Sequence, residues 1–261
     1  MSDNCFKRCL EFNTQYNLIA VQDSLLVSVS AGPDSLFLIH YICKHFPENE
    51  KRFIYFDHQS RSLEIIKEKK LLQEILSSYG QVLLVKKIPV NAYMKRFNVS
   101  FEMGARACRY TCLEFYASLF KCNKVLTAHH FDDDIETLIL KVQYYNSTSF
   151  YGILPKRRLH NSELIRPMLC LSKDDILLYL KINKFDYCID SSNFNLKFKR
   201  NYIRHVSLPK LRSIDSQFNQ KYALILHRSR EFHYLKERMM PVISDFLIND
   251  DSVVYISLDV F

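Results

Sequence analysis

Residues 25–38, with the sequence LLVSVSAGPDSLFL, constrain the fold of this chain more than any other stretch. The first five residues form a short apolar run of the length expected for a buried parallel strand. Gly32 and Pro33 interrupt this run, and a second apolar segment of helical length follows at once. Pro33 suits the first turn of a helix, because its φ is preset and it has no N–H to lose. The stretch therefore predicts a strand, a tight loop and a helix in direct succession.

The loop in this stretch, SAGPDS at residues 30–35, is suited to hold a phosphate group. Serine hydroxyls and free backbone N–H groups at a helix N-terminus form a ready anion site. Asp34 cannot bind phosphate directly, but it can hold the Mg²⁺ that accompanies a nucleotide. An ordinary strand-to-helix turn is the alternative, although such a turn hardly needs the whole hexapeptide. The loop lacks both the Gly-Lys-Ser/Thr of a Walker loop and the G-x-G-x-x-G fingerprint.

Strand-like and helix-like segments alternate along the chain. Expected strands are residues 25–30, 52–56, 81–85 and 124–128; expected helices are residues 35–46, 63–79 and 101–121, with a fourth near Asp132. This alternation predicts an α/β fold: a Rossmann-like parallel sheet with helices on both faces, and ligands at the carboxyl ends of the strands. Asp57 and His58 follow the second strand and should reach the same edge as the loop. We expect a catalytic domain over residues 1–205 and a helical appendage over 206–261 that ends in a strand-like run.

Composition narrows the class of protein. The 261 residues carry a net charge of +8 with a pI near 9, which favours a polyanionic partner. No apolar run approaches a membrane span, and the N-terminus has no signal-peptide core. The eight cysteines include no Cys-x-x-Cys pair, which argues against a zinc ribbon or an iron–sulfur site. We expect reduced thiols in a cytoplasmic protein, or in the plastid stroma if the gene is organellar.

An acidic cluster follows the fourth expected strand, in the sequence HHFDDDIET at residues 129–137. Three acids that open a helix are commonly only partners of the helix dipole. Asp132 and Glu136, however, are four residues apart on one helix face, where they can hold a cation or an ammonium group together. We expect a functional role for this cluster.

Basic residues occur in three segments, at residues 106–109, 156–158 and 197–204. Arg106 and Arg109 share a helix face with Glu102, so Glu102–Arg106 could equally be a simple i,i+4 pair. Aromatic residues interleave with the cations between residues 197 and 204, as on RNA-facing surfaces, although a solvated basic helix is the alternative. The candidate RNA contacts are Arg106, Arg109, Lys156, Arg157, Arg158, Lys199, Arg200 and Arg204.

Taken together, these blocks resemble the tRNA(Ile)-lysidine synthetase family of the PP-loop ATP pyrophosphatases. The matching blocks, in order, are SAGPDS at 30–35, DHQSR at 57–61, EMGARACRY at 102–110, HHFDDDIET at 129–137, IRPML at 165–169, DSSN at 190–193 and RNYIRHVSLP at 200–209. Ala31 stands where the family has its first glycine. A glycine-rich turn after the His-His block is replaced by YYNST, with only Gly152 left. The chain also stops where the family's next domain would open, so we expect a short form.

The resemblance implies a ligase that uses ATP and Mg²⁺. ATP adenylates the wobble cytidine of the CAU anticodon of tRNA(Ile), pyrophosphate leaves, and the amine of L-lysine displaces AMP. The implied ATP-binding residues are Ser30, Ala31, Gly32, Pro33, Asp34, Ser35, Asp57 and His58. The implied catalytic residues are Asp34, Asp132, Asp133, Glu136 and Arg106, of which Asp34 and Asp133 hold the metal while Asp132 and Glu136 bind lysine. Arg106 and Arg109 would clamp the cytosine and its phosphate. A homodimer is one expected arrangement.

Three other readings fit part of the sequence. A PP-loop tRNA thiolase would share the loop, but those that resemble this chain depend on a Cys-x-x-Cys cluster. A GMP- or NAD-synthetase-like enzyme fits the loop and leaves residues 129–137 and 200–209 unexplained. A degenerate tRNA-binding module would have lost catalysis, whereas this chain retains the acidic and arginine residues of the pattern.

Overall fold

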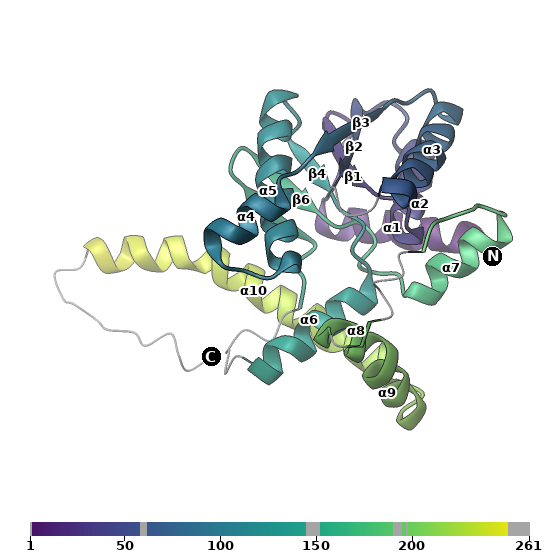
Figure 1. Cartoon of the computed structure of the whole chain (residues 1–261). Helices are drawn as coiled ribbons and strands as arrows, with labels where there is room; N and C mark the ends of the chain where they lie inside the picture. The colour runs from purple at the N-terminus through teal and green to yellow at the C-terminus, as the bar shows by residue number, and fades with distance from the viewer. Residues whose placement is uncertain (1, 58–61, 145–151, 190–194, 197, 250–261) are drawn as a thin grey trace. The chain divides into compact units, whose positions relative to one another are not determined.

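The computed structural model describes residues 2–57, 62–144, 152–189, 195–196 and 198–249 (Figure 1). The chain divides into two compact units. Unit 1 consists of Met1–Phe131 and Pro155–Ser191, and unit 2 consists of Asp132–Leu154 and Ser192–Phe261. The expected domain boundary after residue 205 stays a prediction.

Unit 1 contains a six-stranded sheet and the helices that cover it (Figure 1). The strands are β1 (Leu25–Val29), β2 (Lys51–Asp57), β3 (Leu83–Lys87), β4 (Lys124–Leu126), β5 (Lys156–Leu159) and β6 (Ser162–Ile165). The helices are α1 (Ser2–Tyr16), α2 (Pro33–His45), α3 (Ser62–Ser78), α4 (Val90–Phe97), α5 (Phe101–Leu119) and α7 (Lys173–Ile182).

The strand order β3-β2-β1-β4-β6-β5 confirms the expected α/β fold. All neighbouring strands are parallel except β5, which pairs antiparallel with β6. The chain moves outward from β1 through β2 to β3 and then returns to place β4 on the other side of β1. The carboxyl ends of β1 and β4 therefore meet at a topological switch point, which is where open α/β sheets bind their ligands.

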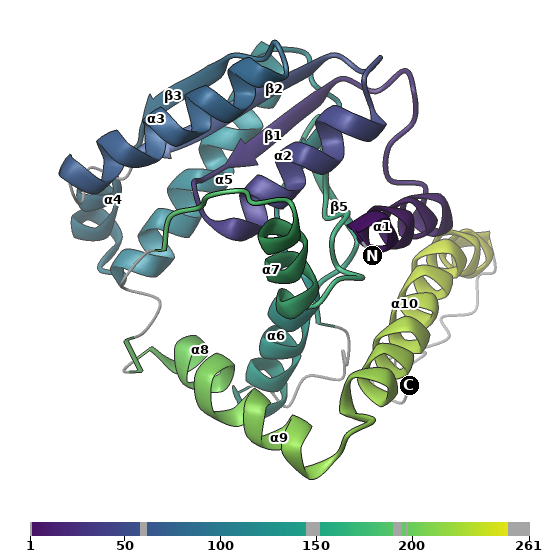
Figure 2. The same cartoon turned by 90° about the vertical axis from the view of Figure 1, so that its right-hand side faces the viewer.

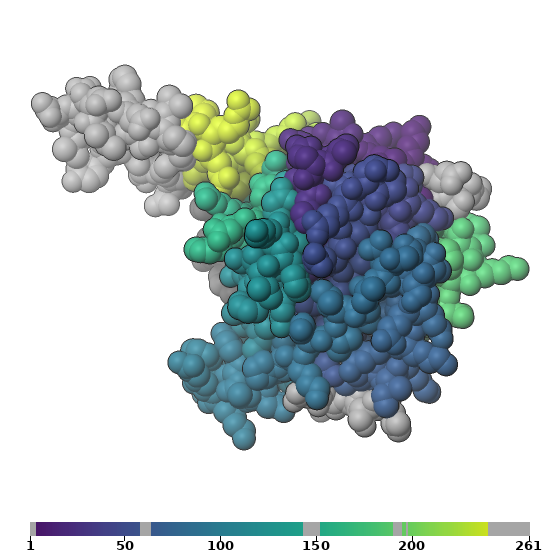
Figure 3. All heavy atoms as spheres, turned by 90° about the horizontal axis from the view of Figure 1, so that it is seen from above, coloured from purple at the N-terminus to yellow at the C-terminus, as the bar shows by residue number. Residues whose placement is uncertain are grey.

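Alternating side chains of the strands pack against helices on opposite faces of the sheet. Leu26 of β1 and Ile54 of β2 belong to a core that includes Leu113 of α5. On the other face, the ring of Phe6 in α1 packs 5.3 Å from that of Phe37 in α2. Figures 1 and 2 show α4 and α5 on one face, and α2 and α3 on the other. In the space-filling view the N-terminal segment, in purple, lies directly against the next part of the chain, in dark blue (Figure 3).

Most expected elements are present within a few residues of their predicted ends. Gly80 terminates α3 in the left-handed region (φ +66°), where the N–H of Gln81 donates to the Leu76 carbonyl at 2.9 Å. Ser172 and Asp175 form a capping box at the start of α7. Helices α1 and α4 and the β5–β6 hairpin were not predicted from the sequence. A signal for α1 was available, because Phe6, Cys9 and Phe12 recur at helical spacing and are buried.

Unit 2 is helical in its described part. Its elements are α6 (Phe131–Tyr144), whose first residue belongs to unit 1, α8 (Lys199–Tyr202), the π-helical turn η2 (Ile203–Ser207), α9 (Leu208–Ile214) and α10 (Phe218–Asn249). Figure 2 shows α8, η2 and α9 as one continuous green segment at the end of α6. The expected helical character after residue 208 is confirmed, and the strand-like run at the end lies outside the described residues. Within the described part of the chain, we find no helix long and apolar enough to cross a membrane.

Candidate functional site

The loop between β1 and α2 is held by its own serine side chains. The hydroxyl of Ser35 accepts a hydrogen bond from the backbone N–H of Ser30 at 2.9 Å and lies 3.3 Å from the Ser30 hydroxyl. Gly32 has an extended backbone (φ −73°), and a Cβ there would meet only Ser30 Oγ, at an ordinary 3.5 Å. Neither backbone strain nor crowding by the protein requires this glycine. The bare backbone instead allows a ligand to approach the loop closely.

Ala31, the departure from the family's glycine, fits the loop without strain. Its side chain is fully buried, and its carbonyl accepts a hydrogen bond from the N–H of Cys188 at 2.8 Å. Among the described non-glycine residues, positive φ occurs only at Asn17, Asn98, Lys121 and Lys184. The backbone at position 31 therefore does not adopt the conformation that only glycine takes up freely.

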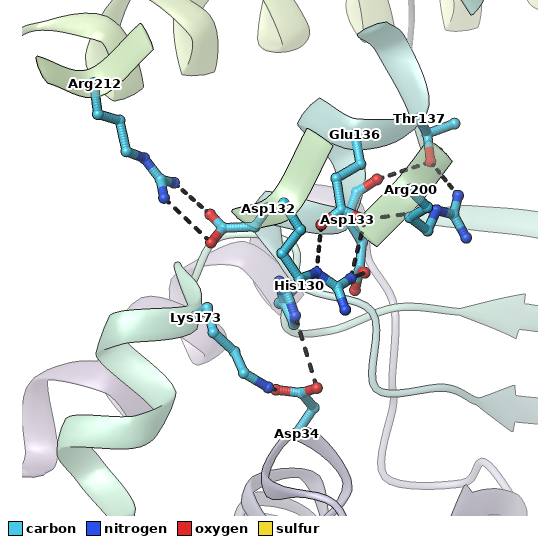
Figure 4. A network of polar contacts seen from close by, with 10 residues as sticks. Asp34, His130, Asp132, Asp133, Glu136, Thr137, Lys173, Arg200 and Arg212 are labelled. Atoms are coloured by element: carbon cyan, nitrogen blue, oxygen red, sulfur yellow. Dashed lines mark hydrogen bonds and ion pairs between the residues drawn. The ribbon is translucent and has the colours of Figure 1, made fainter. Parts of the chain in front are cut away.

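Asp34 lies at the centre of a charged group within unit 1 (Figure 4). Its Oδ1 is 2.5 Å from Nζ of Lys173, in the first turn of α7, and its Oδ2 is 3.7 Å from Nε2 of His130. His130 follows β4 and is buried, whereas the side chain of Asp34 is 28% exposed. The switch point thus brings together the loop after β1 and the segment after β4, as predicted. Lys173 was not predicted as a site residue, and it directly follows Ser172, the N-cap of α7.

The chemistry of Asp34 fits an oxygen-liganded Mg²⁺. Magnesium keeps several waters and is commonly held by one or two carboxylates together with phosphate oxygens. Asp34 presents a partly exposed carboxylate at the mouth of a candidate phosphate loop. Among the described residues, no group of three or more His, Cys, Asp or Glu side chains could hold a metal.

Asp57 ends β2 at the same edge of the sheet. Its carboxylate is buried and lies 2.8 Å from Nζ of Lys69 in α3, and its carbonyl accepts a hydrogen bond from the N–H of Ile88. These contacts fix the end of the strand, and the expected role of Asp57 in ATP binding stays a prediction. His58 lies outside the described residues, and so does the Asp-x-Ser-Asn block at residues 190–193.

In unit 2, the acidic start of α6 is paired with arginines. Glu136 is fully buried; its two carboxylate oxygens lie 2.6 and 3.0 Å from Nε and Nη2 of Arg204, and Oε2 is 3.5 Å from Nε of Arg200. Arg204 also contacts Asp133 at 2.9 Å, and Arg200 donates to the Thr137 hydroxyl at 3.1 Å. Figure 4 shows these side chains converging. Burial raises the pKa of Glu136 above its ordinary value, while the positive charge of Arg204 opposes this shift.

Two further acids of α6 have partners that the sequence did not suggest. Arg212 of α9 contacts Asp132 at 2.6 Å, so Asp132 and Glu136 share a helix but pair with different cations. Asp134 is fully buried against Arg230 of α10 and accepts a hydrogen bond from the N–H of Ile153. Arg212 and Arg230 were missed because the segment after residue 208 shows only helical, polar character in the sequence.

Gly152 has a structural reason to be glycine. A Cβ at this position would collide with a carboxylate oxygen of Asp134 and would lie 2.6 Å from its backbone carbonyl. Close approach of the backbone to the buried start of α6 therefore excludes any side chain at residue 152.

The expected RNA-contacting cations lie in different surroundings. Arg106 and Arg109 are exposed on α5, Arg157 and Arg158 are exposed on β5, Lys156 is half-buried, and Lys199 is exposed on α8. Arg200 and Arg204, by contrast, contact carboxylates of α6. Their assignment to RNA binding, like the assignments of lysine and metal ligands, stays a prediction.

The geometry can be compared with known proteins. A tRNA(Ile)-lysidine synthase of Bacillus thuringiensis subsp. konkukian is 29% identical to this chain over 241 residues, which cover 91% of this chain and 51% of that protein. The bifunctional protein TilS/HprT of Listeria monocytogenes serotype 4b is 32% identical over 80% of this chain and 33% of its own length. The chain thus spans about half the length, or less, of these relatives.

The fold also has solved counterparts. The U34-tRNA thiolase NcsA from Methanococcus maripaludis, a structure with a [4Fe-4S] cluster, superimposes with a TM-score of 0.69 over 88% of this chain and 78% of that chain. Sequence identity is only 11%, so this likeness shows the fold alone. The profile of the PP-loop domain matches residues 4–211, which is well over half of the chain. Together with the loop, the strand order and the switch point, this match shows that the chain belongs to the PP-loop domain family.

Proposed function

We propose that this chain catalyses ATP-dependent ligation of L-lysine to the wobble cytidine of the CAU anticodon of tRNA(Ile). The relatives named above and the PP-loop family support this reading. The observation that carries it is the group at the switch point, where Asp34, Lys173 and His130 meet beside the open backbone of Gly32. Such a site suits a nucleotide triphosphate, because it offers N–H groups, hydroxyls and a cation around one carboxylate.

The first half-reaction would take place at the loop. The oxygen at C2 of the cytosine attacks the α-phosphorus of ATP, and the bond to pyrophosphate breaks. Ser30, Ser35 and the N–H groups at the start of α2 would hold the phosphates, and Asp34 would hold Mg²⁺, which neutralises the developing charge on the leaving pyrophosphate. Lys173 is close enough to Asp34 to exchange that contact for a phosphate oxygen when the nucleotide and its metal arrive.

The second half-reaction would use the acids of α6. The amine of lysine attacks the activated carbon, AMP leaves, and a carboxylate accepts the proton that the amine loses. Asp132 and Glu136 are the proposed partners of lysine. Both now contact arginines, so an incoming ammonium group would compete with Arg212 or Arg204 for them.

The test measures each half-reaction with the full chain and a tRNA(Ile) transcript that bears a CAU anticodon. We expect pyrophosphate exchange that depends on the tRNA, and AMP release that depends on lysine. Substitution Asp34→Ala should lower both by orders of magnitude while tRNA affinity barely changes. Asp215→Ala is a matched control, because Asp215 also pairs with a lysine, Lys221, but lies away from the loop in sequence.

Two outcomes would contradict the proposal. Near-normal ATP turnover in the Asp34→Ala variant would remove this residue from the mechanism. Exchange without any effect of lysine would point instead to another PP-loop tRNA-modifying reaction, such as a thiolase-like one.

A further inference from the structure

Two arginines from separate elements of unit 1 share one tyrosine ring. The guanidinium carbon of Arg106, on α5, lies 5.0 Å from the ring centroid of Tyr110, one turn further along the same helix. The guanidinium carbon of Arg157, on β5, lies 5.4 Å from the same centroid. A cation within about 6 Å of an aromatic ring is attracted by the quadrupole of the ring. Tyr110 therefore holds two guanidinium groups near one another, although the arginines that carry them are far apart in the sequence.

A third arginine holds the other end of the tyrosine. Arg166, which follows β6, is buried, and the Tyr110 hydroxyl is close enough to its guanidinium to oppose the lowering of the Arg166 pKa that burial causes. Its backbone is fixed as well, because its N–H donates to the carbonyl of Pro155 at 2.9 Å. Arg166 therefore places a third guanidinium near Tyr110, at the hydroxyl of the ring that Arg106 and Arg157 contact.

Arg106 and Arg157 have no carboxylate partner among the residues that the structure describes. Within the described part of the chain, neither Arg106 nor Arg157 forms an ion pair, and the neighbouring acid Glu102 pairs with neither of them. Arg204 and Arg212 in unit 2 show the opposite pattern, since each contacts a carboxylate. Like charges held close together repel one another, and an anion that binds between them relieves this repulsion.

The surroundings favour a single-stranded nucleic acid over a free anion. Met103 lies one turn before Arg106 and is 61% exposed, and Phe97 and Phe101, at the nearby α4–α5 corner, are also exposed. Exposed aromatic side chains beside arginines are typical of surfaces on which unpaired bases stack while their phosphates are neutralised.

We propose that Arg106 and Arg157 form a phosphate-binding site for a single-stranded segment of RNA, with Tyr110 as the residue that positions both guanidiniums. The inference rests on the proposed function, which supplies the RNA as the anticodon loop of a tRNA. It goes further because it separates these two arginines from Arg200 and Arg204, whose charge is already balanced within the protein.

The test compares the salt dependence of binding for the wild-type chain, three variants of this group and two control variants. The probes are tRNA(Ile) and a single-stranded oligouridylate. Arg157→Gln should flatten the log–log salt slope by about 0.7 to 0.9, the value for one phosphate contact. Tyr110→Leu should flatten it by up to about 1.5, because both guanidiniums lose their common ring. Tyr110→Phe keeps the ring and should keep most of the slope.

Two matched controls come from the same unit. Arg52 also lies over an aromatic ring, that of Phe120, but it pairs with Glu50; Arg52→Gln should leave the slope unchanged. Tyr116 also carries a cation, Lys86, over its ring, and Tyr116→Leu should likewise have no effect on the slope. Circular dichroism establishes that each variant is folded.

A folded Tyr110→Leu variant with the wild-type slope would overturn the proposal, as would equal slopes for Arg157→Gln and Arg52→Gln. Because binding of the oligouridylate involves no reaction, its salt slope tests the RNA site independently of the proposed lysine ligation. If the variants behave as expected on it but the wild type shows no lysine-dependent AMP release, the proposed function fails and the RNA site stands. If AMP release is normal and the slopes do not change, only the RNA site fails.

Discussion

Ala31 shows how one residue adapts to a loop that its family builds with glycine. Its methyl group is buried and its φ is not positive, so the loop keeps its shape with an alanine. We expect Ala31→Gly to leave pyrophosphate exchange equal or slightly faster. The free energy of unfolding should fall by roughly 1 to 2 kcal/mol, because a buried methyl is lost and the unfolded chain gains freedom. Urea unfolding and the exchange assay measure the two effects, and a large loss of activity would show that the methyl group is needed for function.

His40 predicts how stability depends on pH. It is buried in α2, stacked 3.8 Å from the ring of Phe185, and Nδ1 lies 2.7 Å from the Tyr79 hydroxyl. Burial, with help from Lys44, lowers its pKa from 6.5 to about 4. The unfolded chain therefore takes up this proton below about pH 6.5, and the folded chain only below about pH 4. Stability from this residue is complete above pH 6.5 and decreases as the pH falls toward 4.

The measurement is urea unfolding of wild type and His40→Gln at pH 7 and pH 5. The loss of unfolding free energy between the two pH values should be smaller in the variant by roughly 2 kcal/mol, which is 1.36 kcal/mol for each pKa unit crossed. An equal loss in both proteins would mean that His40 does not control this pH dependence.

At the scale of single elements, α6 is held by the segment from α8 to α10. Glu136 is contacted by both Arg200 and Arg204, and the latter sits on the π-helical turn η2, a rare geometry that often occurs at functional sites. If Glu136 works on lysine after ATP has reacted, Glu136→Gln should raise the lysine requirement and let adenylated tRNA accumulate. Rapid-quench analysis of labelled ATP and tRNA would measure this. An equal loss of the first half-reaction would instead place Glu136 on the metal or in the fold.

The elements also show what could be predicted from the sequence. The strand–loop–helix at residues 25–45 was predictable because a buried strand, a Gly-Pro break and an apolar helix are all local signals. The pairing of Asp34 with Lys173 was not, since it depends on α7 packing next to α2 and leaves no periodic trace. The hairpin β5–β6 was missed because KRRL reads as a basic cluster, and only the pairing of Arg157 with Leu164 makes it a strand. The ion pairs Asp132–Arg212 and Asp134–Arg230 could not be predicted either, because their partners lie far apart in the sequence.

For the whole molecule, the net charge of +8 predicts a strongly salt-dependent affinity for tRNA. If the basic segments at residues 156–158 and 197–200 contact about four phosphates, the log–log slope should be roughly −3. Neutralising Lys156, Arg157 and Arg158 together should flatten it by about two units and weaken binding to every tRNA alike. Filter binding over a series of salt concentrations measures the slope. An unchanged slope would mean that residues 156–158 form only a solvated face. The segment around Lys199 would then be the candidate surface for tRNA.

The pairing of Asp134 with Arg230 has a consequence for where the folded unit ends. The similarity to PP-loop domains stops at residue 211, but the buried carboxylate of α6 is neutralised by an arginine well beyond that point. Shortening the protein to the matched region would delete this guanidinium, and breaking a buried ion pair by removing one partner costs roughly 3 to 5 kcal/mol. That loss is a large fraction of the stability of a typical domain. The end of the matched PP-loop domain and the limit of autonomous folding are therefore different, and a shortened version should extend past residue 230.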